Sequence, residues 1–91
     1  MHRRRAVYFG RVQGVGFRAT TRDLANGFAI AGWVRNDPAP DFSVTLEAQG
    51  DEAEVSRFLA RLNEVLARNI STQHHAPIPV VEGETGFVIR R

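Results

Sequence analysis

The sequence contains no cysteine, so disulfides, thiolate metal ligands and thiol nucleophiles are all excluded. The lack of cysteine also agrees with a reducing compartment, and we expect a cytoplasmic protein. No apolar run approaches the ~20 residues of a membrane-spanning helix. The basic start, Met1–Arg5, is not followed by the long apolar segment of a signal peptide. We therefore expect neither a membrane segment nor a leader.

Lysine is also absent, and all 12 basic side chains are arginine. The formal net charge is only +2, but it is unevenly spread. Residues 1–35 hold seven arginines against one acid, Asp23, whereas residues 36–91 hold five arginines against nine acids. The positive first part favours anionic ligands. The alternative is that Arg3–Arg5 form a frayed, solvated tail.

The first cluster with chemical meaning is Gly10–Arg18, GRVQGVGFR. A β-rich run leads into a loop with Gly14 and Gly16, and a helical pattern follows. Glycines allow the loop to turn its N–H groups inward, and the first N–H groups of a helix favour an anion. Arg18 adds a planar donor that fits a phosphate or a carboxylate. The pattern predicts a small-anion cradle, with a tight structural turn as the alternative.

The hydrophobic periodicity predicts a strand over Ala6–Val12 and a helix over about Phe17–Asn26. Further strands are expected over Ala29–Arg35 and Phe42–Ala48, the second with one buried face carrying Phe42. A second helix is expected to begin after Asp51, with Glu54 completing a capping box and with a pair between Glu64 and Arg68. The remaining expectations are a helix end at Asn69, a loop over 70–76, an edge strand over Ile78–Glu82 and a short strand over Phe87–Arg90.

The resulting order is β-α-β-β-α-β with a possible extra short strand near the end. This is the α+β, ferredoxin-like split βαβ plan, in which two helices cover one face of an antiparallel sheet. A chain of 91 residues suits one domain with one core, spanning residues 1–91. The plan serves many functions and decides none of them.

Two blocks in the sequence resemble the acylphosphatase family. Gly10–Arg18 matches the family block G-x-V-Q-G-V-x-F-R at every fixed position, and Gly32–Asn36 matches G-W-V-x-N. The resemblance covers residues 6–68 well and the C-terminal part poorly. The turn Pro38–Asp41 lacks the usual glycine of the family, and the Gly-Pro pair that usually follows the second helix is missing.

The resemblance implies hydrolysis of an acyl phosphate to a carboxylate and inorganic phosphate. It implies that Arg18 binds the phosphate and that Asn36 positions the attacking water, as the catalytic residues. The implied phosphate-binding loop consists of Gln13, Gly14, Val15, Gly16 and Phe17, and we call residues 13–17 the cradle loop. No metal or cofactor is implied. The expected partner is a small-molecule acyl phosphate, with no membrane and no nucleic acid; nothing in the sequence specifies the oligomeric state, and we expect a monomer.

The motif contains no histidine, cysteine, aspartate or glutamate, which agrees with this reaction. A carboxylate leaving group is the conjugate base of an acid with a pKa of ~4, so it departs unprotonated and needs no general acid. Positioning and neutralisation of the phosphoryl oxygens then remain as the main requirements.

Other residues have less specific interpretations. His74-His75 lack a third ligand at a known spacing and are expected to be solvated rather than metal-bound. The acids Asp51, Glu52 and Glu54 are expected to favour a helix start. Trp33 and Phe9 are placed on the open sheet face, where they would form a shielded apolar patch, contact a partner or stack on RNA bases.

The alternatives to the hydrolase are therefore an anion-binding or regulatory module with little turnover, and an RNA-binding domain. A fragment of a hydrogenase-maturation protein, whose N-terminal domain carries a similar block, is a further alternative. We expect the chain to be complete at Arg91.

Overall fold

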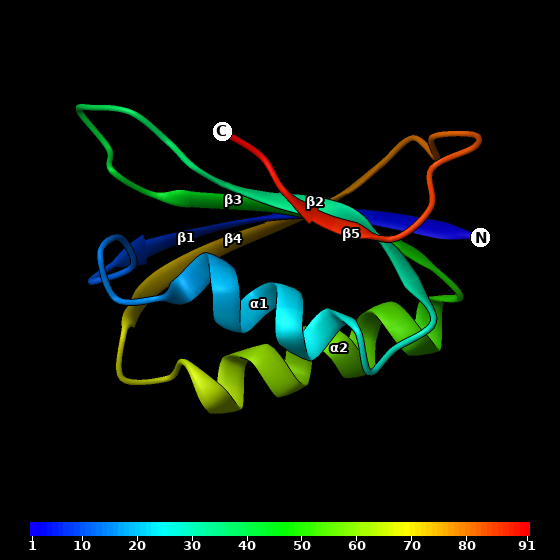
Figure 1. The fold of residues 1–91 in the computed structure, drawn as a ribbon, viewed down its shortest axis with the longest axis horizontal. Helices are drawn as coiled ribbons and strands as arrows, with labels where there is room; N and C mark the ends of the chain where they lie inside the picture. The colour runs from blue at the N-terminus through cyan, green and yellow to red at the C-terminus, as the bar shows by residue number, and fades with distance from the viewer.

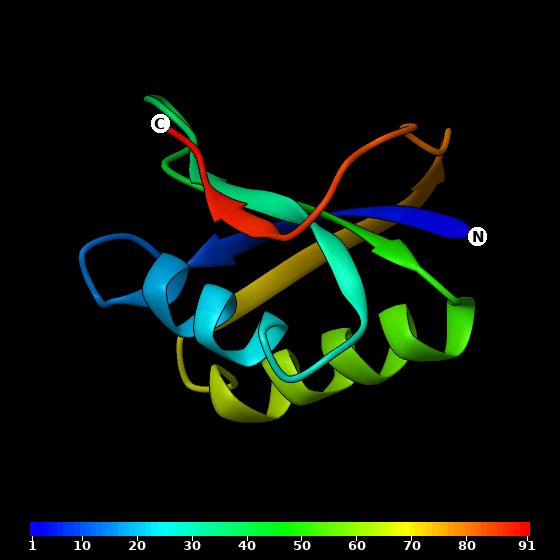
Figure 2. The same ribbon diagram turned by 45° about the vertical axis from the view of Figure 1, so that its right-hand side comes forward.

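The computed structural model describes residues 1–91, and its elements follow the expected order. The sheet order is β4-β1-β3-β2-β5. Both helices lie on the same face of the sheet (Figures 1 and 2). The elements are β1 (His2–Gly10), α1 (Phe17–Ala25), β2 (Ile30–Asn36), β3 (Val44–Gly50), α2 (Glu52–Val65), β4 (Ile70–Ile78) and β5 (Phe87–Ile89).

The ferredoxin-like plan is confirmed, with one refinement at the sheet edge. Strands β1 to β4 pair antiparallel, as expected. The extra short strand β5 pairs with β2 in parallel, so the five-stranded sheet is mixed. Neither helix combines the length and the apolar character that crossing a bilayer requires.

The core lies between the helices and the sheet, and the predicted periodicities place it well. Ala6, Tyr8 and Val12 are buried, as are Phe17 and Thr21 on α1. An apolar stripe with helical spacing along α2 is buried throughout, and it consists of Val55, Phe58, Leu59, Leu62 and Leu66. Gly10 shares the face of Ala6 and Tyr8 by strand alternation, but it is exposed at the end of β1.

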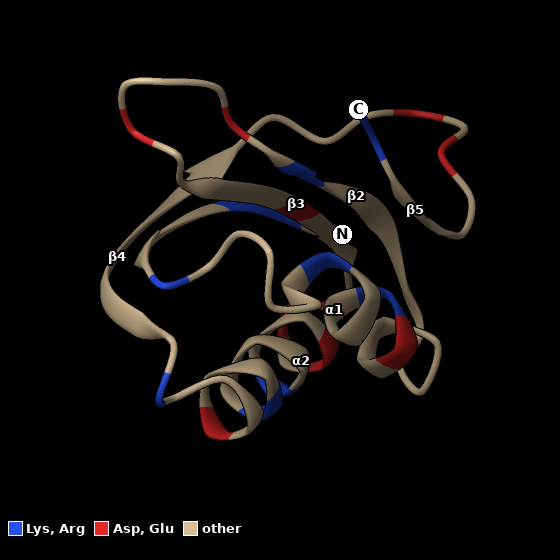
Figure 3. Ribbon diagram, turned by 60° about the vertical axis from the view of Figure 1, so that its left-hand side comes forward, with Lys and Arg blue, Asp and Glu red and all other residues tan.

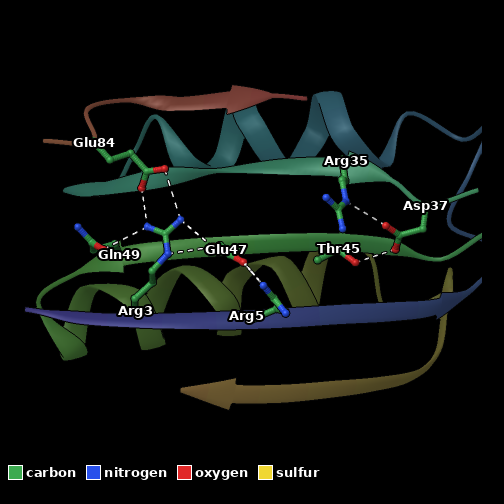
Figure 4. Close-up of polar contacts among 8 residues, drawn as sticks. All are labelled: Arg3, Arg5, Arg35, Asp37, Thr45, Glu47, Gln49 and Glu84. Atoms are coloured by element: carbon green, nitrogen blue, oxygen red, sulfur yellow. Dashed lines mark hydrogen bonds and ion pairs between the residues drawn. The ribbon is translucent and has the colours of Figure 1, made fainter. Parts of the chain in front are cut away.

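The N-terminal arginines do not form a solvated tail. They belong to β1, and Arg3 is only 2% exposed. Arg3 donates to Glu47, Gln49 and Glu84, and Arg5 donates to the second oxygen of Glu47 (Figure 4). These side chains and the loop after β4 cover part of the sheet face opposite the helices.

Because of this cover, every residue of β3 is buried, which corrects the expectation of one buried face. Thr45, Glu47 and Gln49 have their polar side chains on the second face, and each of these residues is 6% exposed. Phe42 was expected to face the core, but it lies before the strand and is 57% exposed. Its φ of 48° is a turn conformation that does not continue a strand.

The region after α2 differs most from its prediction. Residues 70–76 were expected to be a loop, yet they form most of β4, and only Ile78 of the predicted strand Ile78–Glu82 belongs to it. The strand pairs with β1 alone, and its side chains are largely exposed. Its sequence therefore lacks the alternation of apolar and polar residues from which a strand is predicted. Pro77 is tolerated because β4 is an edge strand.

The contacts at the two ends of α2 also differ from those predicted. Asp51 is the N-cap residue, but its side chain makes no capping bond. Glu54 accepts instead from the backbone N–H of Ala29 and from Arg57. Glu64 lies 3.9 Å from Arg61 rather than pairing with Arg68, since the helix ends at Val65, before Arg68.

Candidate functional site

The cradle loop and the start of α1 form one wall of a pocket of about 320 Å³. Gly14 and Gly16 have φ values of 74° and 78°, the left-handed region that glycine enters without penalty. Gly16 is also the N-cap residue of α1. The lining residues are Val12, Gly14, Gly16, Phe17, Arg18, Ala19, Asn36, Ile89 and Arg91.

The backbone of this wall is rich in free donors. None of the N–H groups of residues 13–19 donates a hydrogen bond to another protein group. The first intrahelical bond of α1 is donated by Thr20, whose N–H lies 3.0 Å from the Gly16 carbonyl oxygen. A helix start with free N–H groups and no side-chain cap has a partial positive charge that favours an anion.

Arg18 lies in the first turn of α1 and is half-buried. Its guanidinium forms no ion pair, whereas Arg3, Arg5 and Arg35 are each bonded to a carboxylate. The pocket wall therefore offers an unneutralised planar donor beside the free backbone N–H groups. No aspartate or glutamate lines the pocket.

Asn36 is the last residue of β2 and lines the same pocket as Arg18. Its side-chain oxygen is buried and accepts no hydrogen bond from the protein. Buried acceptors are usually satisfied, and an exception calls for an explanation such as a bound water or ligand. The position of Asn36 depends on Gly32, because a side chain there would collide with the Glu47 carbonyl oxygen on β3.

The loop after Asn36 is fixed by polar contacts from two sides. The Gln13 side-chain N–H group donates to the carbonyl oxygens of Asp37, at 2.7 Å, and Ser43, at 2.9 Å. The Asp37 carboxylate accepts from Ser43, from Thr45 at 2.6 Å and from Arg35. Burial would raise the pKa of Asp37, but these hydrogen bonds outweigh it and hold the pKa below its usual value.

Figure 3 shows the charges around this arrangement. Acidic segments lie in the loop between β2 and β3 and in the loop before β5, and basic segments lie along β1 and α1. In the first of these loops, the carboxylate of Asp37 is held by its own hydrogen bonds. The only charged residues in the pocket lining are arginines.

Most of the residues predicted for the site meet at this pocket. Gly14, Gly16, Phe17, Arg18 and Asn36 line it. Gln13 and Val15 do not: the Gln13 side chain ties the cradle loop to the loop after β2, and Val15 is 41% exposed.

Sequence reasoning missed the contribution of the C-terminal segment, Ile89 and Arg91. A usable signal was present, because the alternation of side chains along the predicted strand Phe87–Arg90 places residue 91 on the same face as Phe87 and Ile89.

The other candidate residues are not organised for chemistry. His74 packs against Phe9 and His75 against Tyr8, so the two rings lie on opposite faces of β4. No group of three potential ligands is placed to hold a metal ion. Trp33 is only 5% exposed, and the guanidiniums of Arg35 and Arg90 lie over its ring. It is therefore not displayed for stacking on bases, and it forms the shielded patch instead.

Comparison with known proteins decides the family. The acylphosphatase family model matches residues 4–89. The chain belongs to the acylphosphatase family. The resemblance seen in the two motifs is thereby confirmed, and so is the expectation of an acylphosphatase; the match also extends through the C-terminal part, where the sequence departs from the usual pattern.

Individual acylphosphatases agree with this assignment. The acylphosphatase of Methanospirillum hungatei is 35% identical over 92 residues, which cover 100% of this chain and 99% of that relative. That of Mesorhizobium japonicum is 48% identical over 65 residues, covering 68% of this chain and 67% of that relative. The crystal structure of the acylphosphatase from Bacillus subtilis superposes with a TM-score of 0.85 at 27% identity and covers 100% of both chains.

Proposed function

We propose that this protein hydrolyses acyl phosphates, with the phosphoryl group bound by the N–H groups of the cradle loop and by Arg18. Asn36 positions the attacking water. The observation that carries the proposal is the shared pocket of Gly14, Gly16, Phe17, Arg18 and Asn36, beside seven consecutive backbone N–H groups without a protein acceptor. Membership of the acylphosphatase family supports the reaction class.

The proposed chemistry needs only what the pocket contains. The N–H groups and Arg18 neutralise the phosphoryl oxygens, which is the dominant requirement in phosphoryl transfer. The carboxylate departs as an anion, so the lack of an acidic or histidine residue in the lining is no obstacle.

Asn36 has an amide that can accept one proton of the attacking water through its oxygen and donate a hydrogen bond elsewhere. The buried, unpartnered oxygen of Asn36 is the acceptor that this role requires. The proton released by the water is taken up by an oxygen of the phosphate itself, since the pocket lining offers no carboxylate or imidazole.

The test is release of inorganic phosphate from benzoyl phosphate by the purified protein. We expect the parent to hydrolyse it and Arg18→Ala to lose at least ~3 kcal/mol of transition-state binding, as when an oxyanion donor is removed. Arg18→Lys should also be poor, because a point charge does not replace the planar fork. The matched control is Arg22→Ala, one turn further along α1, where the side chain is exposed and lies 3.8 Å from Asp23.

Two results would contradict the proposal. A parent protein that binds inorganic phosphate but does not turn over benzoyl phosphate would be an anion-binding module. Equal activity in Arg18→Ala and Arg22→Ala would remove Arg18 from the site.

A further inference from the structure

We propose that Arg91 is a second phosphoryl-binding arginine, which approaches the ligand from the sheet side of the pocket while Arg18 approaches from α1. The inference rests on the proposed function for its ligand, a phosphoryl dianion.

The position of Arg91 follows from the pairing of β5 with β2. Val34 and Ile89 are parallel partners, and the Arg90 N–H donates to the Val34 carbonyl oxygen at 2.8 Å. Asn36 and Arg91 each lie two residues further along their own strand direction. Because side chains alternate along extended backbone, both fall on the helix-covered face, and both line the pocket.

The neighbouring residue Arg90 has the opposite orientation. Its guanidinium lies 4.6 Å from the centre of the Trp33 ring, and Arg90 does not line the pocket. The two adjacent arginines are therefore separated by the alternation of the strand, and only Arg91 is placed next to Asn36.

The charged side chains of the pocket lining also fit this role for Arg91. Neither Arg91 nor Arg18 forms an ion pair, although Arg3, Arg5 and Arg35 all do. The side chains in the lining include two guanidiniums and no aspartate or glutamate, so their formal charge matches that of a dianion. A phosphoryl group with a second pKa of about 6 is such a dianion at neutral pH.

Two guanidiniums should favour the dianion over the monoanion more strongly than one does. Arg91 is therefore expected to set the charge preference of the site. This effect distinguishes direct contact with the phosphoryl group from a structural role in holding β5, because a structural role would weaken the binding of both charge states alike.

The experiment measures the dissociation constant of inorganic phosphate by calorimetry, at mildly acidic and at mildly alkaline pH, around the second ionisation of phosphate. The variants are Arg91→Gln, Arg91→Lys and, as the matched control, Arg90→Gln. We expect Arg91→Gln to weaken dianion binding by about tenfold, at the low end for a charge-assisted hydrogen bond. It should weaken monoanion binding less, whereas Arg91→Lys should keep most of the affinity and Arg90→Gln should stay within about twofold of the parent.

The inference is overturned if Arg91→Gln binds the dianion as tightly as the parent, or if it loses the same factor at both pH values. Benzoyl phosphate hydrolysis by the same proteins separates this inference from the proposed function. If the parent does not hydrolyse benzoyl phosphate but its phosphate binding depends on Arg91, the proposed function is contradicted and the inference about Arg91 stands. If the parent hydrolyses benzoyl phosphate but Arg91→Gln binds phosphate as the parent does, only the inference about Arg91 is overturned.

Discussion

The position of Asn36 in the pocket is set by the strand that it ends and by the loop that follows it. It ends β2, its side-chain oxygen is buried without a protein donor, and the loop that follows it is held by Gln13 and Asp37. In the proposed function, an amide in that setting binds a water molecule in one orientation. The proposed role of Arg18, by contrast, is to contribute charge, for which it needs only to reach the phosphoryl oxygens.

The two residues should therefore affect different kinetic parameters. We expect Asn36→Ala to lower kcat by about 100-fold or more, at the lower bound for losing a group that acts mainly in the transition state, while phosphate affinity falls only a few-fold. Steady-state kinetics with benzoyl phosphate and phosphate inhibition measured on the same samples give both values. The control is Asn26→Ala, at the exposed C-cap of α1. Parental kcat in Asn36→Ala would show that the residue does not position the water.

At the residue scale, the candidate residues that the sequence predicted all lie in two contiguous motifs. Arg18 and Asn36 belong to the blocks Gly10–Arg18 and Gly32–Asn36, and both line the pocket as expected. Arg91 has no such motif. Strand alternation indicates only the face on which Arg91 lies, whereas its place at the end of β2 follows from the parallel pairing of β5 with β2, which joins segments more than fifty positions apart.

The elements that bring the site together are two loops and the strand ends that carry them. The cradle loop follows β1, and the loop over residues 37–43 follows β2. Gln13 joins the two by donating to the carbonyl oxygens of Asp37 and Ser43. The second loop lacks the usual glycine, and Phe42 takes a positive φ near the point where it enters β3.

The Asp37 carboxylate gives this loop a predictable response to pH. Its pKa is below the ordinary value in the folded protein, because hydrogen bonds from Thr45, Ser43 and Arg35 outweigh partial burial. A depressed folded-state pKa stabilises the fold fully above the unfolded-state value of about 3.9, and this stabilisation is lost as the pH falls through the folded-state pKa.

Urea unfolding of the parent and of Asp37→Asn, between about pH 6 and about pH 3, tests this response. We expect the parent to have the larger free energy of unfolding at the upper pH, and the difference between the two proteins to shrink as the pH falls. Glu47 and Glu54 also have lowered pKa values, but both proteins contain them, so their contribution cancels in the comparison. A difference that is constant across this range would show that the Asp37 charge does not stabilise the fold.

Among the elements, each strand and helix with an apolar face was predicted at the right place in the chain, although the bounds of β3 and the end of α2 differ, and β4 was not predicted. The stripe on α2 that includes Phe58 and Leu62 is a property of side chains, and it can be read from spacing. Strand β4 is held mainly by backbone hydrogen bonds to β1. Every residue except proline offers the same backbone donor and acceptor, so such pairing leaves no pattern in the sequence.

At the scale of the whole molecule, the two sheet faces are covered by different means. The helices cover one face with an apolar core, whereas part of the other is covered by the network of Arg3, Glu47, Gln49, Glu84 and Arg5 (Figure 4). Gln49 extends this network to the loop after β4 through two bonds of 2.8 Å with the Val81 backbone. Charged residues are usually solvated, so the sequence alone gave no reason to place Arg3 in a buried contact.

The network predicts a large contrast between two neighbouring arginines. The Arg3 side chain is 1% exposed and the Arg5 side chain 53%, although both contact Glu47. We expect Arg3→Met to lower the free energy of unfolding by ~3–5 kcal/mol, because it removes the buried cation shared by Glu47 and Glu84 and leaves Glu47 with the exposed Arg5 alone. Arg5→Ala should cost less than ~1 kcal/mol, as exposed ion pairs do. Urea unfolding measures both, and equal losses in the two variants would contradict the assignment of Arg3 as the centre of the network.

The central claim is that the free N–H groups of the cradle loop and of the first turn of α1 bind a phosphoryl group together with Arg18. Titration of the isotope-labelled protein with inorganic phosphate, followed through its backbone amide resonances, tests it most directly. We expect the largest shifts at residues 13–19, saturating with one dissociation constant and disappearing in Arg18→Ala. The account would be contradicted if phosphate shifted resonances elsewhere but left the amide resonances of residues 13–19 unchanged.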